Sequence, residues 1–106
     1  MDVIQIITTT ANADDARRIA QALVERRLAA CVQIVGPIQS IYQWEGRIET
    51  AAEFQCCIKT RAELYDAVEN LVRELHSYDV PEILAVPVIR GSGAYLEWLK
   101  QETPVE

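Results

Sequence analysis

The sequence predicts an α+β fold of the split-βαβ, ferredoxin-like type, in which two helices cover one face of a four-stranded antiparallel sheet. Four segments carry the apolar runs or alternation of strands, and two carry the three-and-four spacing of amphipathic helices. These segments follow one another in the order β-α-β-β-α-β, and a short helix is expected after them. Since the 106 residues are 50% hydrophobic and no linker rich in Pro, Gly or Ser divides them, we expect one domain over residues 1–106.

The first strand and the first helix are expected at the start of the chain. Residues 3–9 form a mostly apolar run that is typical of a strand. Asn12 is a suitable N-cap for the helix that follows, two aspartates fall in its first turn, and Arg26 and Arg27 fall in its last turn. This charge order is the one that the helix dipole favours.

Two strands, residues 31–44 and 47–60, are expected to form one unusually long β-hairpin with Glu45-Gly46 as its turn. Arms of roughly a dozen residues exceed the usual strand of about five or six. An arm that is longer than its own sheet needs another surface to lie on. The most economical surface is a neighbouring copy of the same chain, so the hairpin predicts self-association.

Side chains along the hairpin add two expectations. Gly36-Pro37 predicts a bulge or an unpaired edge in the first strand, because proline cannot donate a ladder hydrogen bond. Tyr42 and Trp44 lie two residues apart and therefore share one face of the arm.

A second amphipathic helix is expected over residues 61–76. Its predicted buried side consists of Leu64, Val68, Leu71, Val72 and Leu75. A loop over residues 77–82 leads to a strand over 83–89, and a short helix over 94–102 follows. Pro87 places the strand near an edge of the sheet.

The face of the sheet that the helices leave open is predicted to be unusually apolar. By alternation it carries Val3, Gln5, Ile7, Cys31, Gln33, Val35, Gln55, Cys57 and Lys59. A water-facing sheet normally alternates apolar and charged residues, whereas this set contains one charge. We therefore expect another copy of the chain to cover this face.

Composition and charge limit the classes of function. The net charge of −6 argues against nucleic-acid binding, which needs clustered Lys and Arg, and it is compatible with cations. The first residues lack the basic region of a signal peptide, no stretch is long enough to cross a membrane, and three cysteines suggest no disulfide framework. We therefore expect a reduced, cytoplasmic setting and no membrane contact.

The segment from His76 to Glu82 is the candidate metal site. It contains the only histidine and two carboxylates, Asp79 and Glu82, a donor set of the N/O type that suits a divalent metal ion. The alternative is that His76 only caps the end of the preceding helix. Residues from a second subunit could complete the coordination shell that one loop leaves open.

Other candidate residues have two interpretations each. Aromatic residues lie in the hairpin arm or near element ends, where they could anchor an interface or line a ligand pocket: Tyr42, Trp44, Tyr78, Tyr95 and Trp98. Cys31 is expected to be a buried, inert thiol unless its surroundings are electropositive. Lys59 could pair with a carboxylate such as Glu53, or it could face a pocket where subunits meet.

Signatures of common enzymes are missing from the sequence. It has no Gly-rich phosphate loop, no GxSxG motif and only one histidine that could serve as a base. The central strand lacks the aromatics of an RNA-recognition module, and the first loop lacks the arginine and glycines of an acylphosphatase-like enzyme. We therefore expect a protein without enzymatic activity.

Five stretches, in the same order, are similar to motifs of the CutA family of divalent-cation tolerance proteins. They are RLAACV at 27–32, SIYQWEGRIE at 40–49, IKT at 58–60, LHSYDVPEI at 75–83 and YLEWL at 95–99. The resemblance covers nearly the whole chain. It implies a homotrimer of ferredoxin-like subunits similar to PII signalling proteins, and a role in the homeostasis of copper and other divalent ions. Two residues depart from the family pattern: Ser77 replaces the usual proline of His-Pro-Tyr, and Gln33 replaces a common asparagine.

With this family in view, His76, Asp79 and Glu82 are the candidate ligands of a divalent metal ion such as Cu²⁺, and Cys31 is a further candidate. The resemblance also implies an alternative function, that of a PII-like sensor that binds a small molecule between subunits. The residues expected to line that intersubunit cleft are Trp44, Lys59, Tyr78 and Trp98.

Overall fold

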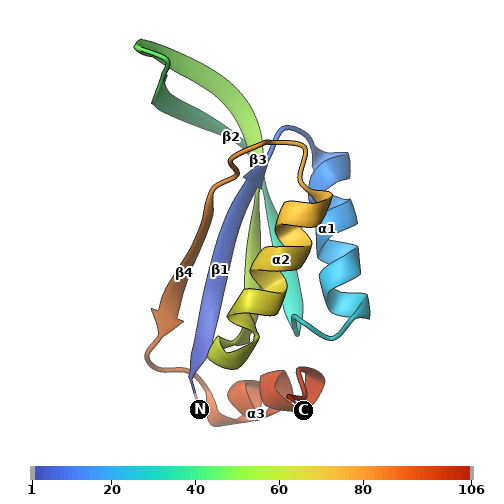
Figure 1. Cartoon of the computed structure of the whole chain (residues 1–106). Helices are drawn as coiled ribbons and strands as arrows, with labels where there is room; N and C mark the ends of the chain where they lie inside the picture. Colours follow the sequence, from blue (N-terminus) through green and yellow to red (C-terminus); the bar gives the residue numbers. More distant parts are fainter. Residues whose placement is uncertain (1, 106) are drawn as a thin grey trace.

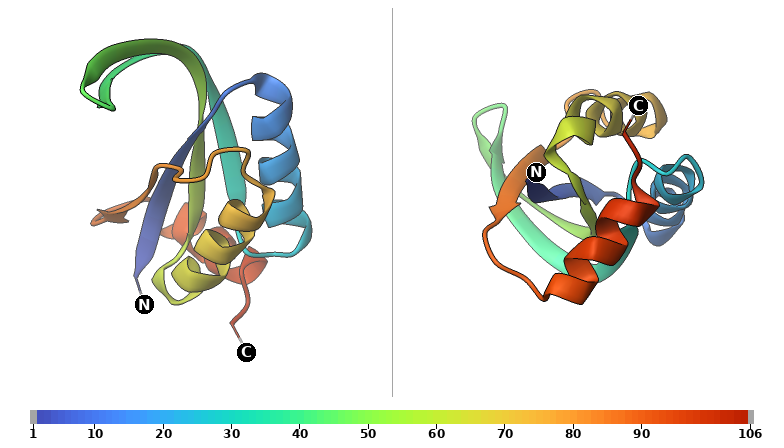
Figure 2. Two further views of the ribbon diagram at one scale, coloured as in Figure 1. Left: turned by 45° about the horizontal axis from the view of Figure 1, so that its top comes forward. Right: turned by 90° about the horizontal axis from the view of Figure 1, so that it is seen from below.

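The computed structural model describes residues 2–105 and confirms the α+β, ferredoxin-like fold (Figure 1). Its elements are β1 Val3–Thr10, α1 Ala13–Glu25, β2 Cys31–Trp44, β3 Arg47–Arg61, the 3₁₀ helix η1 Ala62–Leu64, α2 Tyr65–Leu75, β4 Ile83–Val88 and α3 Gly93–Glu102. The strands are antiparallel and lie in the order β2-β3-β1-β4. Helices α1 and α2 cover one face of the sheet, and α3 lies across the end that is farthest from the hairpin tip (Figures 1 and 2).

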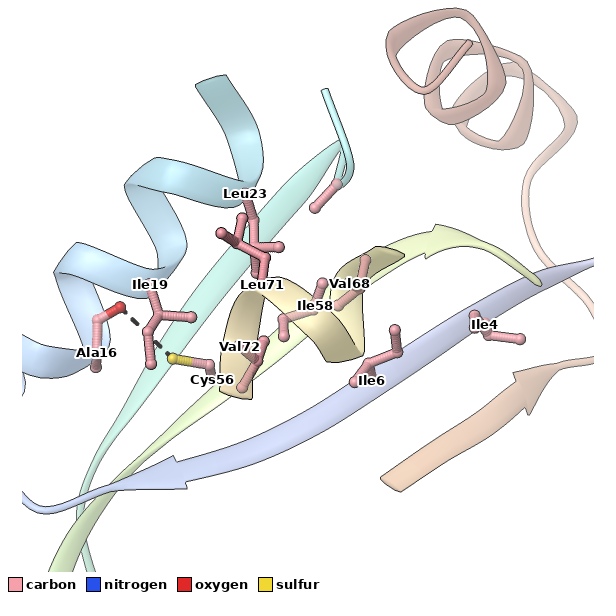
Figure 3. Packing of buried hydrophobic residues seen from close by; sticks show 11 residues of the cluster. Ile4, Ile6, Ala16, Ile19, Leu23, Cys56, Ile58, Val68, Leu71 and Val72 are labelled. Atoms are coloured by element: carbon pink, nitrogen blue, oxygen red, sulfur yellow. Dashed lines mark hydrogen bonds between the residues drawn. The ribbon is translucent and has the colours of Figure 1, made fainter. Parts of the chain in front are cut away.

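The core lies between the sheet and the two helices. Ile6 of β1, Ile19 of α1 and Val72 of α2 are fully buried within it (Figure 3). Cys56 of β3 lies in the same cluster, and its thiol donates to the backbone oxygen of Ala16 at 3.7 Å. Burial raises the pKa of Cys56 to about 11, so this thiol is protonated and unreactive near neutral pH.

Helix α1 begins as predicted but ends earlier. The Asn12 side chain accepts the backbone N–H of the residue three positions on at 2.8 Å, which confirms the N-cap. The prediction that Arg26 and Arg27 form the last turn is wrong, because the helix ends before Arg26 and Arg27 has a positive φ of 59°. The Arg27 guanidinium instead donates to the carbonyl oxygens of the last two residues of α3 at 3.1 and 3.3 Å.

Helix α2 begins later than residue 61, because β3 continues to Arg61, which pairs with Val3 of β1. One turn of 3₁₀ helix then leads into α2. The predicted buried side is confirmed: Val68, Leu71 and Val72 are buried, and Leu64 and Leu75 are partly buried.

Strands β2 and β3 form the long hairpin that the sequence predicts, and its outer half leaves the sheet as a curved arm (Figures 1 and 2). The pairing register shifts across Gly36-Pro37, which confirms the predicted bulge. Glu45 and Gly46 have φ values of 49° and 78°. Two successive positive values are what a two-residue type I′ hairpin turn requires.

The open face of the sheet carries the residues that alternation predicts, as the register of β1, β2 and β3 confirms. Strand β4 occupies an edge, as Pro87 indicates, and adds Leu84, Val86 and Val88 to this face. Leu84 is 58% exposed and Val35 of β2 is 47% exposed. A single subunit therefore leaves a broad apolar surface on the face away from α1 and α2.

Helix α3 closes one end of the sheet. Leu99 packs with Val3 and Ala30 in a second small cluster. Arg61 donates to the backbone oxygen of Lys100 at 2.6 Å and so, together with Arg27, holds the C-terminal end of the helix. Within residues 2–105, no helix is both long and apolar enough to cross a membrane.

Candidate functional site

A groove of about 600 Å³ lies beneath the hairpin arm, at the end of the sheet away from α3. Its lining residues come from the arm, from the end of β1 and from the loop between α2 and β4. Figure 1 shows where these three segments lie in the fold. The lining residues are Thr9, Ser40, Ile41, Tyr42, Trp44, Glu53, Tyr78, Asp79, Val80 and Glu82.

Strand register determines which side chains the arm presents to the groove. Beyond the bulge, Ser40, Tyr42 and Trp44 alternate to one face, and Glu53 shares that face because it pairs with Ile38. Tyr42 and Trp44 are 44% and 55% exposed, so much of each aromatic ring is free in the single subunit.

Glu53 is the buried carboxylate of the groove. The residue is 8% exposed, and its Oε2 accepts the Tyr78 hydroxyl at 2.8 Å. Burial, followed by this hydrogen bond and the Glu53 charge, raises the pKa of Tyr78 to about 12, so the hydroxyl remains a donor near neutral pH. The pair ties the loop after α2 to β3.

His76 holds this loop against the end of β1. Its Nε2 lies 2.8 Å from the Thr9 carbonyl oxygen, and its Nδ1 lies 3.1 Å from the backbone nitrogen of Tyr78, which donates to it. A carbonyl can only accept, so Nε2 carries the proton and Nδ1 is the acceptor. His76 is the C-cap residue of α2, but its ring bonds β1 and the loop rather than the carbonyls of its own helix.

Asp79 and Glu82 both line the groove, on the same side as Tyr78. Ser77, where the family pattern has proline, donates its hydroxyl to Asp15 Oδ2 of α1 at 3.4 Å. In the described part of the chain, no three His, Cys, Asp or Glu side chains are arranged to hold one metal ion. The loop therefore brings two of the predicted ligands into the groove but does not form a complete shell within one subunit.

The other predicted site residues lie toward the opposite end of the sheet. Cys31 pairs with Lys59, which pairs with Gln5 of β1, four residues from Thr9 and so about 13 Å along the strand. Trp98 of α3 packs against Tyr95, with ring centroids 5.5 Å apart. Of the four predicted cleft residues, Trp44 and Tyr78 meet in the groove, whereas Lys59 and Trp98 do not line it.

Of the two possibilities for Lys59, the structure does not show the pairing with Glu53. The Lys59 ammonium donates to Gln33 Oε1 on the open face, which also gives a role to the glutamine that replaces the common asparagine. Lys59 and Glu53 share a face of β3, but six residues of extended strand separate them by about 20 Å.

Glu53, Thr9 and Ser40 belong to the groove without having been predicted as site residues. The alternation of β3 contained the signal for Glu53, because it places residues 53, 55, 57 and 59 on one face. The same alternation places Thr9 on the open face with Ile7, and Ser40 on the arm face with Tyr42. It does not show that these residues meet in one groove.

Residues 4–102 match the family model described as CutA1 divalent ion tolerance protein. The rice (Oryza sativa subsp. japonica) relative named Protein CutA 1, chloroplastic, is 45% identical over 100 residues, which are 94% of this chain and 56% of the relative. The Divalent-cation tolerance protein CutA of Archaeoglobus fulgidus is 44% identical over 91% of this chain and 93% of its own length. The chain thus spans about half the length of the plant relatives it matches and nearly all of the archaeal one.

Solved structures with a similar degree of sequence identity share the fold. The crystal structure of CutA1 from Oryza sativa superposes with a TM-score of 0.97 at 42% identity, covering 100% of this chain and 97% of that one. The Archaeoglobus fulgidus protein superposes with a TM-score of 0.94 at 41% identity, covering 96% and 99%.

The expectation of a cytoplasmic setting needs correction. The rice relative is named chloroplastic, and the solved Archaeoglobus fulgidus structure is described as a periplasmic protein. Similar chains therefore carry names from more than one compartment. The expectation rested on the cysteine count and on the first residues of the sequence, and this basis was too weak. Cysteines that form no disulfide framework are compatible with more than one compartment.

Proposed function

Because the chain belongs to the CutA1 divalent ion tolerance protein family, we propose that it is a single-domain, non-enzymatic homotrimer that binds copper or another divalent metal ion in metal homeostasis. The observation that carries this proposal is the position of the loop after α2. It places Asp79 and Glu82 in the lining of one groove, and His76 of the same segment contacts the carbonyl oxygen of Thr9, which also lines that groove.

Two features support the trimer. The open sheet face leaves apolar side chains of β2 and β4 in water, and the arm carries exposed aromatic rings beyond the edge of its own sheet. Burying both surfaces against neighbouring subunits removes the unfavourable contact of apolar area with water. In the described part of the chain no other element covers them.

The donor chemistry of the loop fits a metal ion under two conditions. His76 must give up the Tyr78 N–H bond at Nδ1 to offer a lone pair, which costs on the order of 1 kcal/mol. The remaining ligands must come from a neighbouring subunit, and Cys31 is the candidate thiol, because it lies too far along the sheet to join its own loop.

Titration calorimetry of the metal-free protein with Cu²⁺ and Zn²⁺ tests the proposal. We expect His76→Gln to weaken Cu²⁺ binding and to reduce its pH dependence, since a ligating imidazole must be neutral and so binding weakens as pH falls. Glu97→Gln in α3, an exposed carboxylate outside the groove, is the control and should bind as the parent does. Equal affinity and equal pH dependence of parent and His76→Gln would show that His76 is structural.

The groove supports a second candidate, a PII-like sensor that binds a small ligand between subunits. A concave site with three aromatic residues, Tyr42, Trp44 and Tyr78, and a buried carboxylate is typical of small-molecule pockets. In this arrangement Lys59 and Trp98 would reach the cleft from a neighbouring subunit. Ligand binding that persists in a chelator would favour this candidate over the metal site.

A further inference from the structure

We propose that Lys59 of one subunit forms an ion pair with Glu82 in the groove of the next subunit, so that the subunits join head to tail around the trimer. This pairing rests on the trimer proposed above. It adds the two residues that join one subunit to the next and the orientation in which the subunits must meet.

The Lys59 side chain has no carboxylate partner in its own subunit. It is partly buried on the open face, between Gln5 of β1 and Cys31 of β2, and its ammonium donates to Gln33. Within residues 2–105 it forms no ion pair. If a second copy covers this face, the ammonium loses its contact with water, and a neutral amide alone does not compensate a buried charge. The surface that covers Lys59 therefore has to supply an anion.

The groove has the opposite imbalance of charge. Its lining includes the carboxylates of Glu53, Asp79 and Glu82, and no lining residue is Lys, Arg or His. Glu53 is buried and already accepts the Tyr78 hydroxyl. Asp79 and Glu82 are exposed, and in the described part of the chain neither forms an ion pair. Glu82 directly precedes β4, so this carboxylate borders the open face that a second copy is expected to cover.

Lys59 and Glu82 are too far apart to pair within one subunit. Lys59 and Ile83, the residue after Glu82, are two strands and three residues apart in the sheet, which corresponds to about 14 Å. The Lys59 ammonium also bonds Gln33 of β2, on the side of β3 away from β4. An ion pair between these residues therefore joins two subunits. A contact between different ends of one surface is head to tail, and its repetition can close a ring such as a trimer.

The arm explains how the two residues come together. Tyr42 and Trp44 share a face with Glu53, which in turn shares a face with Lys59, so the aromatic side of the arm continues the open face. The arm extends beyond its own sheet (Figure 1), and both rings are about half exposed. An arm that lies on the open face of the next subunit carries the groove beneath it onto that face, where Lys59 lies.

Charge reversal in the full chain tests the pair, with a chelator present because Glu82 is also a candidate metal ligand. We expect Lys59→Glu and Glu82→Lys each to raise the concentration at which the trimer dissociates by at least about tenfold, since like charges then meet. The double variant restores opposite charges in reversed order and should dissociate within about threefold of the parent. Sedimentation velocity measures dissociation, with the same sub-denaturing urea concentration in every sample.

A second reversal on the other face of the molecule is the matched control. Glu74 is an exposed residue of α2, which covers the face of the sheet opposite the open face. Lys59→Glu combined with Glu74→Lys has the same net charge as Lys59→Glu combined with Glu82→Lys. We expect this control to dissociate as readily as Lys59→Glu alone, because a charge on α2 does not reach the interface.

A zero-length carbodiimide cross-linker gives a measurement on the parent protein. It joins an ammonium to a carboxylate only where the two are in contact, and the chain contains two lysines, Lys59 and Lys100. Peptide mass spectrometry of the cross-linked trimer should find Lys59 joined to Glu82. This measurement decides the question even where a single variant does not fold.

The outcomes separate the pair from the trimer. A monomeric parent at micromolar concentration would overturn both. A trimeric parent whose two single variants assemble as well as the parent, or whose control recovers as fully as the double reversal, would overturn the pair alone. Lys59 cross-linked to another carboxylate, or to none, would also overturn the pair and leave the trimer in place.

Discussion

Tyr78 links three parts of the site through one side chain and its backbone. Its hydroxyl bonds Glu53 of β3, its backbone N–H bonds His76, and His76 in turn bonds Thr9 of β1. The His76 and Tyr78 rings also lie 4.9 Å apart between centroids. Loss of the hydroxyl should therefore loosen the loop without removing its aromatic packing.

Tyr78→Phe should remove a defined part of the pH dependence of stability. The folded-state pKa of about 12 exceeds the ordinary value of about 10, so the protonated hydroxyl contributes stability in full below pH 10. This contribution is lost as pH rises from about 10 to about 12. Urea unfolding of parent and variant over pH 9 to 12 measures it. Other tyrosines titrate in both proteins, so a constant stability difference across this range would contradict the assignment.

At the residue scale, sequence predicted partners only where they are local. The Asn12 cap depends on a backbone N–H three residues away and was predicted. Arg27 was placed in a helix because its charge suits a C-terminus, but its partners are at the end of α3, more than seventy residues along the chain. The Lys59 ammonium donates to Gln33 on the adjacent strand and not to a carboxylate on its own strand.

At the scale of elements, the bulge in β2 determines where the arm leaves the sheet. Gly36 lies against the ring of Phe54 on the paired strand, and a β-carbon at Gly36 would come within 2.5 Å of that ring. The close approach requires glycine because any side chain would displace the ring or the backbone.

Gly36→Ala should therefore destabilise the protein by about 1 to 3 kcal/mol, the usual cost of inserting a methyl group where no space exists. Gly93→Ala, at the first residue of α3, is the matched control, because nothing lies within 4 Å of its added β-carbon. We expect it to be neutral or slightly stabilising. Urea denaturation compares the two variants, and equal stability would show that the Phe54 ring moves aside freely.

Periodicity predicted which elements form and in what order, but it did not predict the end of α1 or the start of α2. The order of strands and helices, the hairpin turn and the edge position of β4 follow from alternation, Glu45-Gly46 and Pro87. The start of α2 was predicted too early, at Arg61, because the helical spacing of the following apolar residues can be extended back to include it. In the structure Arg61 still belongs to β3 and pairs with β1. The groove could not be predicted, because it exists only where the curved arm meets the loop after α2.

For the whole molecule, the open sheet face and the arm predict the state of assembly. We expect a trimeric mass by light scattering at micromolar concentration, since obligate interfaces of this kind bury on the order of 2,000 Å² or more. A monomeric mass at that concentration would contradict both the trimer and any site between subunits.

Trp44 provides a second measure of assembly, because it is 55% exposed in the single subunit. If neighbouring subunits cover it, Trp44→Ala should lower stability by roughly 2 to 4 kcal/mol and make the melting temperature depend more strongly on protein concentration. An unchanged melting temperature, together with water-like tryptophan fluorescence from position 44 in the native protein, would show that the ring stays in solvent.

The position of β1 has a consequence for how the chain is made. Of the strands that the structure describes, β1 is synthesised first, yet it is an interior strand whose neighbours, β3 and β4, come later. On the ribosome this apolar segment has two unpaired edges until Arg61 has emerged to pair with Val3, and one until β4 follows. The hairpin, with its local turn, can form before the strand beside it is paired. We therefore expect chaperone binding to residues 3–10 of the nascent chain to compete with completion of the sheet.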